Sequence, residues 1–276
     1  MNNFVVRTLV GIVFIAVMVF GIIWDRTIFM ILFAYIMMTA LREFYTITLG
    51  RRYGLQQGLG MCAALLAYIA VSTHVFFAVD IRWISLAFLA MLLIPVSVIF
   101  VRNHADFVDI AYIYAGLLYI ALPVTLLPLI MMDGEVFDGW LLLSFFIVIW
   151  IGDVGAYCLG TLFGQGENSR KLAPAISPKK SWVGFWSGVG FSIAVAVGLH
   201  YLTWLPFSLG HCIALGAIIG TAGVCGDLFE SMWKRHFHVK DSGNAIPGHG
   251  GMLDRFDSSL VAIPMAVIYL ELFKLI

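Results

Sequence analysis

Residues 140–162 read WLLLSFFIVIWIGDVGAYCLGTL, an almost uninterrupted run of apolar side chains in which Asp153 is the one charged residue. A helix of about 20 apolar residues spans the roughly 30 Å hydrocarbon core of a bilayer. The run is therefore long enough to cross a membrane, and it predicts a transmembrane helix.

The whole chain shares this apolar character. Its 276 residues are 62% hydrophobic and 12% charged, which is far more apolar than a soluble domain. We therefore expect an all-α integral membrane protein, held in a lipid bilayer.

The 16 basic and 16 acidic residues balance, and the absence of a basic stripe argues against a nucleic-acid partner. The 4 cysteines lie in apolar stretches and form no CxxC pair, which favours small packed side chains over disulfides or metal ligands.

Hydropathy predicts roughly nine transmembrane helices. They fall near residues 8–24, 27–41, 58–74, 83–101, 109–131, 140–162, 182–203, 211–232 and 258–275. We interpret residues 1–139 as a scaffold of transmembrane helices and residues 140–276 as the catalytic region, because the polar chemistry lies in that second part.

The basic residues predict the orientation of these helices. With a cytoplasmic N-terminus, only Arg26, Arg82 and Lys274 fall on the outside, and the other basic residues lie inside. Lys and Arg are retained on the cytoplasmic side of membrane proteins. Two long polar loops, about 163–181 and about 233–257, are then both cytoplasmic, and we expect them to form the active site.

Acidic residues occur within or at the edge of the predicted helices, at Asp153, Asp227 and Glu230. A carboxylate at membrane depth is costly unless it is paired, hydrated or bound to a cation, so each is a functional candidate. Asp227, Glu230 and Ser231 share one helix face by their spacing. Glu230 has an alternative role, an ion pair with Lys234 or Arg235 one turn on that fixes helix packing. Asp227 has no basic residue within a turn, which favours a functional role.

The segment 246–257, IPGHGGMLDRFD, joins glycines to two aspartates at the entrance to the last helix. Glycines let backbone amides approach an anion, and a helix N-terminus adds N–H groups, so the pattern suits phosphate. Asp254 and Asp257 offer the oxygen ligands that Mg²⁺ prefers. Together with the neighbouring basic residues Lys234, Arg235 and Lys240, they indicate metal-assisted phosphoryl or nucleotidyl transfer.

Residues 231–258, SMWKRHFHVKDSGNAIPGHGGMLDRFDS, resemble the signature of the phosphatidate cytidylyltransferases, also called CDP-diacylglycerol synthases. The matching positions are Ser231, Lys234, Arg235, Lys240, Asp241, Pro247, His249, Gly250, Gly251, Asp254, Arg255 and Asp257. Two upstream stretches, WIGDVGAYCLGTLFG and LAPAISPKKSWVGFWSG, are also similar to family motifs. They match at Asp153, Ala156, Tyr157, Ser177, Pro178, Lys180 and Gly184. Ser181 stands where the family has Thr, and Val183 where it has an acid or amide.

The resemblance implies that CTP and phosphatidate react to CDP-diacylglycerol and pyrophosphate. It assigns Mg²⁺ to Asp227 and Asp254, with Asp257 as a third ligand or a carboxylate behind them, and a monovalent cation such as K⁺ to Glu230 and Ser231. The expected triphosphate and head-group contacts are Lys234, Arg235, Lys240 and Arg255. Further substrate contacts are expected from Asp153, Tyr157, Ser177, Lys179, Lys180, Gly250 and Gly251. Asp241 would serve the metal or orient Lys240, and His249 would contact substrate or leaving group.

The family also implies a homodimer, and we expect the bacterial plasma membrane as the location. Two alternatives remain open at this point. One is a family relative that uses another lipid phosphate or has lost activity, because Val183 departs from the pattern. The other is a cation-coupled transporter that uses the intramembrane acids Asp153, Asp227 and Glu230.

Overall fold

The computed structural model describes residues 3–100, 107–166, 169–246, 248 and 250–276. Within these ranges helices dominate, and the strands form short antiparallel hairpins that the sequence did not predict. The fold is therefore that of an all-α integral membrane protein, as predicted.

The chain divides into two compact units. The first unit contains the residues up to Gly139 together with Asp241–Arg255, and the second contains Trp140–Lys240 and Phe256–Ile276. Residues 241–255, which we expected in the second part of the chain, thus pack with the first. The scaffold and catalytic roles of residues 1–139 and 140–276 stay a prediction.

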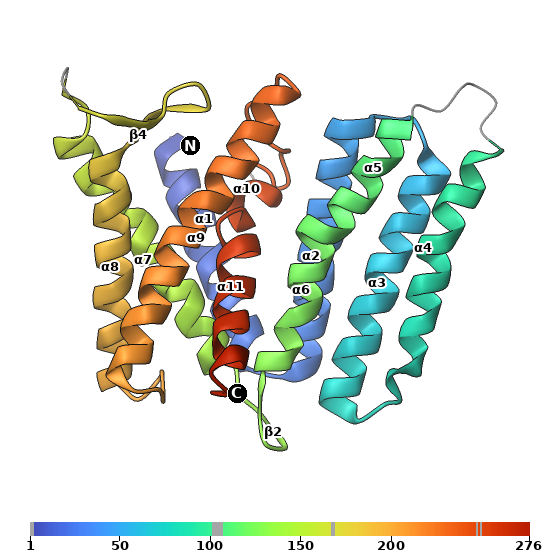
Figure 1. The fold of residues 1–276 in the computed structure, drawn as a ribbon, viewed down its shortest axis with the longest axis horizontal. Coiled ribbons are helices and arrows are strands. Elements are labelled where there is room, and N and C mark those ends of the chain that lie inside the picture. The colour runs from blue at the N-terminus through green and yellow to red at the C-terminus, as the bar shows by residue number, and fades with distance from the viewer. Residues whose placement is uncertain (1–2, 101–106, 167–168, 247, 249) are drawn as a thin grey trace. The chain divides into compact units, whose positions relative to one another are not determined.

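The first unit is a set of long helices with one small hairpin (Figure 1). Its helices are α1 (Asn3–Ile23), α2 (Arg26–Leu49), α3 (Gly54–Phe77), η1 (Ile81–Ile84), α4 (Ser85–Val98), α5 (Phe107–Gly116), η2 (Leu117–Ala121), α6 (Leu122–Leu126) and η3 (Leu127–Ile130). The hairpin pairs β1 (Met132–Asp133) with β2 (Val136–Phe137). The short helix α10 (Leu253–Phe256) begins in this unit.

Helix α2 packs at the centre of the first unit, against α3 and α5. It buries a stripe of large apolar side chains, namely Phe29, Phe33, Met37, Leu41 and Tyr45. The Tyr45 hydroxyl donates a 2.8 Å hydrogen bond to the Ile113 carbonyl, which satisfies the buried phenol. A Cβ at Gly116 would lie 2.7 Å from the Tyr45 ring, so this position needs glycine. Burial and close packing therefore fix α2 in place.

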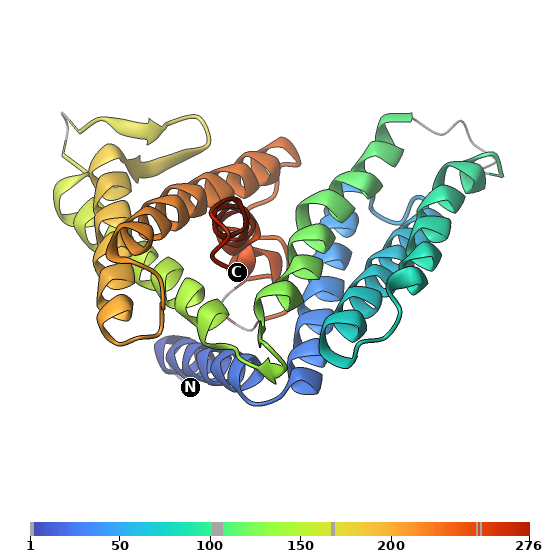
Figure 2. The same cartoon turned by 60° about the horizontal axis from the view of Figure 1, so that its bottom comes forward.

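The second unit consists of long helices and one hairpin (Figure 2). They are α7 (Trp140–Phe163), α8 (Trp182–Tyr201), α9 (Leu209–His236) and α11 (Ser259–Leu272), with β3 (Lys171–Ala173) paired to β4 (Ser177–Ser181). Helix α8 packs between α7 and α9, and α11 packs on α9. A Cβ at Gly152 would lie 2.3 Å from the Ser192 Oγ, and small residues of this kind let membrane helices approach closely.

Among the described residues, 7 helical segments are long and apolar enough to cross a membrane. They include Arg26–Leu49 and Gly54–Phe77, which exceed the predicted segments 27–41 and 58–74. The predicted 27–41 segment stopped before the charges at Arg42 and Glu43, although the helical backbone continues past them. Helices α1 and α11 match the predicted first and last spans in position, and the total of nine spans stays a prediction.

Candidate active site

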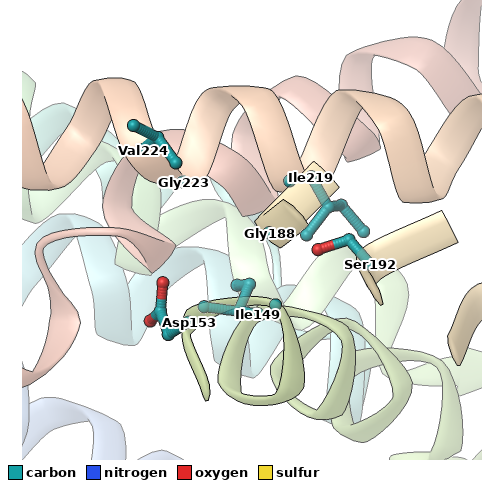
Figure 3. Close-up of a pocket in the computed structure, with 9 residues that line it drawn as sticks. Ile149, Asp153, Gly188, Ser192, Ile219, Gly223 and Val224 are labelled. Atoms are coloured by element: carbon teal, nitrogen blue, oxygen red, sulfur yellow. The ribbon is translucent and has the colours of Figure 1, made fainter. Parts of the chain in front are cut away.

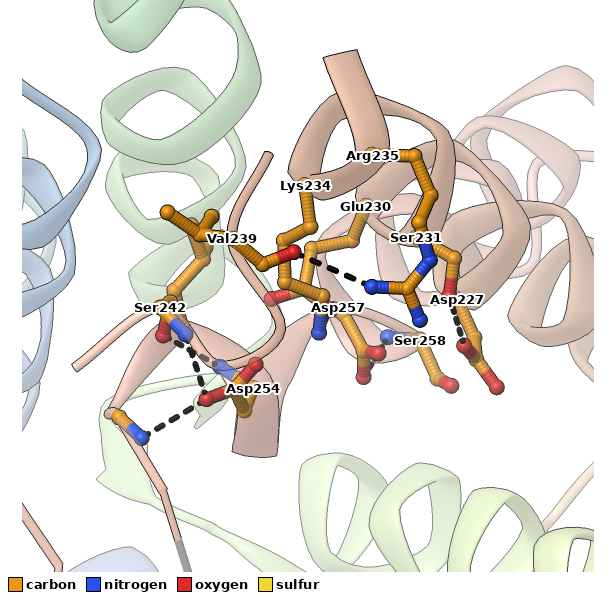
Figure 4. Close-up of polar contacts among 12 residues, drawn as sticks. Asp227, Glu230, Ser231, Lys234, Arg235, Val239, Ser242, Asp254, Asp257 and Ser258 are labelled. Atoms are coloured by element: carbon orange, nitrogen blue, oxygen red, sulfur yellow. Dashed lines mark hydrogen bonds and ion pairs between the residues drawn. The ribbon is translucent and has the colours of Figure 1, made fainter. Parts of the chain in front are cut away.

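Asp227 of α9 interacts with side chains from its own helix and from the hairpin. Its Oδ1 accepts a 3.3 Å hydrogen bond from the Ser231 hydroxyl, one turn further along the same helix. Figure 4 shows this contact between Ser231 and Asp227. The Oδ2 atom of Asp227 lies 2.5 Å from the Lys180 ammonium on β4. The carboxylate therefore does have a basic partner, which comes from a distant loop rather than from within a turn.

Glu230 forms an ion pair inside the protein. Its side chain is 0% exposed, and Oε2 lies 2.6 Å from the ammonium of Lys234, which is 12% exposed. This is the packing alternative that the sequence left open for Glu230. A buried pair of this kind is costly to break because the remaining charge stays buried.

Asp257 lies in the turn between α10 and α11, close to the acids of the second unit. Its Oδ1 accepts a 2.7 Å hydrogen bond from the Ser258 amide. Burial first, and then the negative charges of Asp227 and Asp153, raise the pKa of Asp257 to about 7. Gly226 allows this approach, because a Cβ there would lie 2.4 Å from the Asp257 carbonyl oxygen. The cluster thus holds more negative charge than its surroundings stabilise.

Asp153 lines a small pocket in the second unit, where α7, α8 and α9 meet (Figure 3). The wall contains Gly152, Gly188, Gly220 and Gly223. These glycines let the three helices approach each other, while Asp153 adds a carboxylate to an otherwise mostly apolar lining. The structure therefore places Asp153 at a helix junction near Asp257, consistent with its effect on the pKa of that residue.

The β3–β4 hairpin carries the other predicted substrate contacts, which come from the polar loop near residues 163–181. Ser177 and Lys179 lie on β4 with Lys180, and Lys179 is exposed. Ser181 ends the strand and caps α8, since its hydroxyl accepts a 3.2 Å hydrogen bond from the Gly184 amide. The serine thus performs the capping that a threonine hydroxyl would also supply. Val183 and Tyr157 have exposed side chains.

The glycine-rich loop and Asp254 belong to the first unit. Oδ2 of Asp254 accepts hydrogen bonds from the amides of Ser242 at 2.9 Å and Gly251 at 2.8 Å. Gly248 and Gly250 have φ values of 76° and 85°, a left-handed region that glycine adopts without strain. The Ile246 amide donates to the Gly250 carbonyl at 3.0 Å and closes the loop. Asp254 therefore organises this loop through its own carboxylate.

Glu43 of α2 is a partner of this loop that the sequence interpretation missed. Its carboxylate accepts hydrogen bonds from the Met252 and Leu253 amides, both at 2.9 Å. The Ser242 hydroxyl donates to the same carboxylate, also at 2.9 Å. The sequence does place this charged residue next to a long apolar segment, but we interpreted the charge only as the end of a transmembrane helix.

The remaining predicted residues have fewer contacts. The Arg235 guanidinium donates to the Val239 carbonyl at 3.1 Å, beyond the end of α9. Lys240, Asp241 and Arg255 are exposed, and their predicted roles stay predictions. His249 and Pro247 lie outside the described residues.

The donor set of the second unit fits a divalent cation. Among the described residues, no group of three or more His, Cys, Asp or Glu side chains forms a metal site by itself. Mg²⁺ commonly uses only one or two carboxylates together with substrate phosphates. Asp227 and Asp257 are two carboxylates of this kind within the second unit, and Mg²⁺ at this place stays a prediction.

The comparisons with known proteins agree over nearly the whole chain. Residues 5–273 match the cytidylyltransferase family. A phosphatidate cytidylyltransferase of Staphylococcus haemolyticus is 31% identical over 266 residues, which cover 96% of this chain and 98% of that protein. The corresponding protein of Bacillus subtilis is 34% identical over 211 residues, covering 75% and 76%. That of Rickettsia felis is 34% identical over 196 residues, covering 68% and 84%.

These matches agree with the signature residues described above and with the membrane-spanning helices. The chain therefore belongs to the cytidylyltransferase family, and it is a CTP-dependent nucleotidyltransferase built from membrane helices.

Proposed function

We propose that this chain transfers the cytidylyl group of CTP to phosphatidate, giving CDP-diacylglycerol and pyrophosphate. The observation that carries the proposal is the polar cluster of the second unit. There Asp227, Asp257 and Lys180 come from three separate segments, and the Lys180 ammonium lies directly on the Asp227 carboxylate. Acids and a cation brought together in this way suit phosphate chemistry. The names of the bacterial relatives support phosphatidate as the acceptor.

In this mechanism a phosphate oxygen of phosphatidate attacks the α-phosphorus of CTP. The bond from that phosphorus to the oxygen bridging to the β-phosphate breaks, and pyrophosphate leaves in line. The phosphatidate head group is already ionised near pH 7, so no strong general base is required. Catalysis then consists of positioning and of stabilising the negative charge that develops on the transferring group.

Lys180 is the residue whose position supports a direct role with the triphosphate. Its side chain is 25% exposed while the ammonium itself is buried against Asp227, so binding of the triphosphate would require the ammonium to turn from the carboxylate toward a phosphate oxygen. Lys240, Arg235 and Arg255 are exposed cations and remain proposed contacts of the triphosphate and the head group. Lys234 forms an ion pair with Glu230, so its proposed role is to hold that carboxylate in place.

Mg²⁺ is the proposed cofactor, held by Asp227 and Asp257. When bound there, it would neutralise phosphate charge and withdraw electron density from the phosphorus. Asp254 as a further ligand, and K⁺ at Glu230 and Ser231, rest on the family signature and remain proposals. So do the bacterial plasma membrane, cytoplasmic loops and a homodimer.

The test is release of pyrophosphate from CTP by purified protein in detergent, with phosphatidate and Mg²⁺ added separately and together. Release that requires both additions supports the proposal. ATP in place of CTP, and other lipid phosphates in place of phosphatidate, test the specificity. Release with another lipid phosphate alone would favour the family relative, whereas ion flux in proteoliposomes without nucleotide would favour a transporter.

A further inference from the structure

Glu43 makes a concentrated set of contacts with a segment far from it in sequence. Oε1 accepts from the Met252 amide, and Oε2 accepts from the Leu253 amide and from the Ser242 hydroxyl, all at 2.9 Å. Hydrogen bonds to an ionised carboxylate are stronger than those between neutral groups. A single side chain of α2 thus holds both ends of the segment that runs from Ser242 to Leu253.

Ser242 connects this carboxylate to Asp254. Its hydroxyl donates to Glu43 and accepts a 3.3 Å hydrogen bond from the Asp254 amide. Its own amide donates to Oδ2 of Asp254 at 2.9 Å (Figure 4). The side chain of Asp254 is therefore oriented by a residue that Glu43 itself holds.

The loop is shaped to admit the Glu43 side chain. A Cβ at Gly243 would lie 2.5 Å from Oε1 of Glu43, and a Cβ at Gly251 would lie 2.5 Å from Oε2. Neither contact is possible for a larger residue unless the carboxylate moves. Glycine at position 243 thus has a steric reason that is separate from phosphate binding, namely the Glu43 side chain, whereas a Cβ at Gly251 would meet the Ser242 Oγ more closely still.

We propose that Glu43 is a positioning residue for cytidylyl transfer, which anchors the glycine-rich loop and thereby sets the orientation of Asp254. The inference rests on the proposed function, in which this loop and Asp254 take part. Glu43 needs no contact with substrate for this role. Its carboxylate acts through Ser242 and through the two amides at the start of α10.

Glu43→Gln is the discriminating variant. Glutamine has nearly the same size but replaces one acceptor oxygen by an NH₂ donor, which must then face an N–H or O–H donor of the loop. Glu43→Asp keeps both acceptors and the charge on a shorter stem, so it should lie between wild type and Glu43→Gln. Glu135→Gln, in the exposed turn between β1 and β2, is the matched control.

The first measurement is hydrogen–deuterium exchange of substrate-free protein, followed by mass spectrometry of peptides covering residues 241–256. We expect exchange at this loop to rise by about tenfold in Glu43→Gln, because the half-buried carboxylate that accepts from two amides and one hydroxyl is lost. Glu135→Gln should exchange like wild type. Unchanged loop exchange in Glu43→Gln would overturn the anchoring role.

The second measurement is steady-state transfer with CTP varied. We expect kcat of Glu43→Gln to fall by about tenfold or more while KM for CTP changes by less than about threefold, since positioning affects the reacting geometry.

Should Glu43→Gln unfold throughout, Ser242→Ala removes one hydroxyl of the network and should show the same effects more weakly. Loss of kcat without faster loop exchange, or faster exchange with wild-type kcat, would overturn the proposal. Absence of transfer in wild type would reject the proposed function, and the exchange result would still decide whether Glu43 anchors the loop.

Discussion

The Lys180 ammonium lies 2.5 Å from Oδ2 of Asp227, and the two residues belong to a loop hairpin and a long helix. This ion pair links the two motifs that the sequence shows separately. Both side chains are partly exposed although the Lys180 ammonium itself is buried, and the pair arranges the charges at the site.

Replacing Lys180 should therefore affect transfer more than folding. We expect Lys180→Gln to lower kcat/KM for CTP by roughly 100-fold, because a charged contact to the transferring phosphates is lost. Lys180→Arg should retain part of the activity, since the charge remains but its geometry differs. Initial rates at varied CTP measure this, with Lys274→Gln near the C-terminus as a control. Wild-type rates in Lys180→Gln would remove Lys180 from the site.

A chelator should abolish transfer if Asp227 and Asp257 hold a divalent cation. We expect EDTA to stop pyrophosphate release and added Mg²⁺ to restore it, because the cation neutralises phosphate charge in the transition state. Asp227→Asn should lower the rate by roughly 100-fold or more and raise the Mg²⁺ concentration for half-maximal rate. The Mg²⁺ dependence of the rate checks both. An unchanged dependence in Asp227→Asn would contradict this ligand assignment.

The Glu230–Lys234 pair makes a prediction about stability. Lys234→Met should destabilise the protein by about 3 kcal/mol, because it leaves a buried carboxylate without its cation. The double variant Glu230→Gln with Lys234→Met should recover most of that loss, since neither charge remains. Thermal unfolding in detergent compares the three proteins. Equal melting temperatures for the single and double variants would show that the pair is not coupled.

Orientation in the membrane can be tested with single cysteines in a protein whose native cysteines have been replaced. Lys179→Cys lies in the β3–β4 hairpin and Glu135→Cys in the β1–β2 turn, and both positions are exposed. The excess of basic residues around the hairpin predicts that it faces the cytoplasm. An impermeant maleimide should then label Lys179→Cys, and not Glu135→Cys, in inside-out vesicles. The opposite pattern would reverse the predicted topology.

Close packing at Gly226 should also be essential for the acidic cluster. Gly226→Ala would place a Cβ 2.4 Å from the Asp257 carbonyl oxygen and push the turn away from α9. Overpacking of this kind typically costs about 1–3 kcal/mol. We expect both a lower melting temperature and a lower transfer rate. Gly210→Ala, whose Cβ would meet nothing within 4 Å, should leave both unchanged.

The amino-acid sequence was sufficient to predict the class of fold and most helix positions, because apolar length and helical spacing act locally along the chain. The predicted segments 140–162 and 182–203 became Trp140–Phe163 and Trp182–Tyr201. It also identified Asp227 and Asp257 as candidates, because a carboxylate beside lipid or in a glycine-rich loop is unusual wherever it occurs.

Which of these residues form ion pairs and hydrogen bonds with one another is visible only in the tertiary structure. Lys180 as the partner of Asp227, and Glu43 as the anchor of the loop from Ser242 to Leu253, join segments that are distant in sequence. The structure also shows that Glu230 forms its ion pair with Lys234, one of the partners that the spacing along the helix had left open. Ion pairs and hydrogen bonds act only over a few ångströms in space, and the spacing of residues along a helix reveals only the partners within a turn.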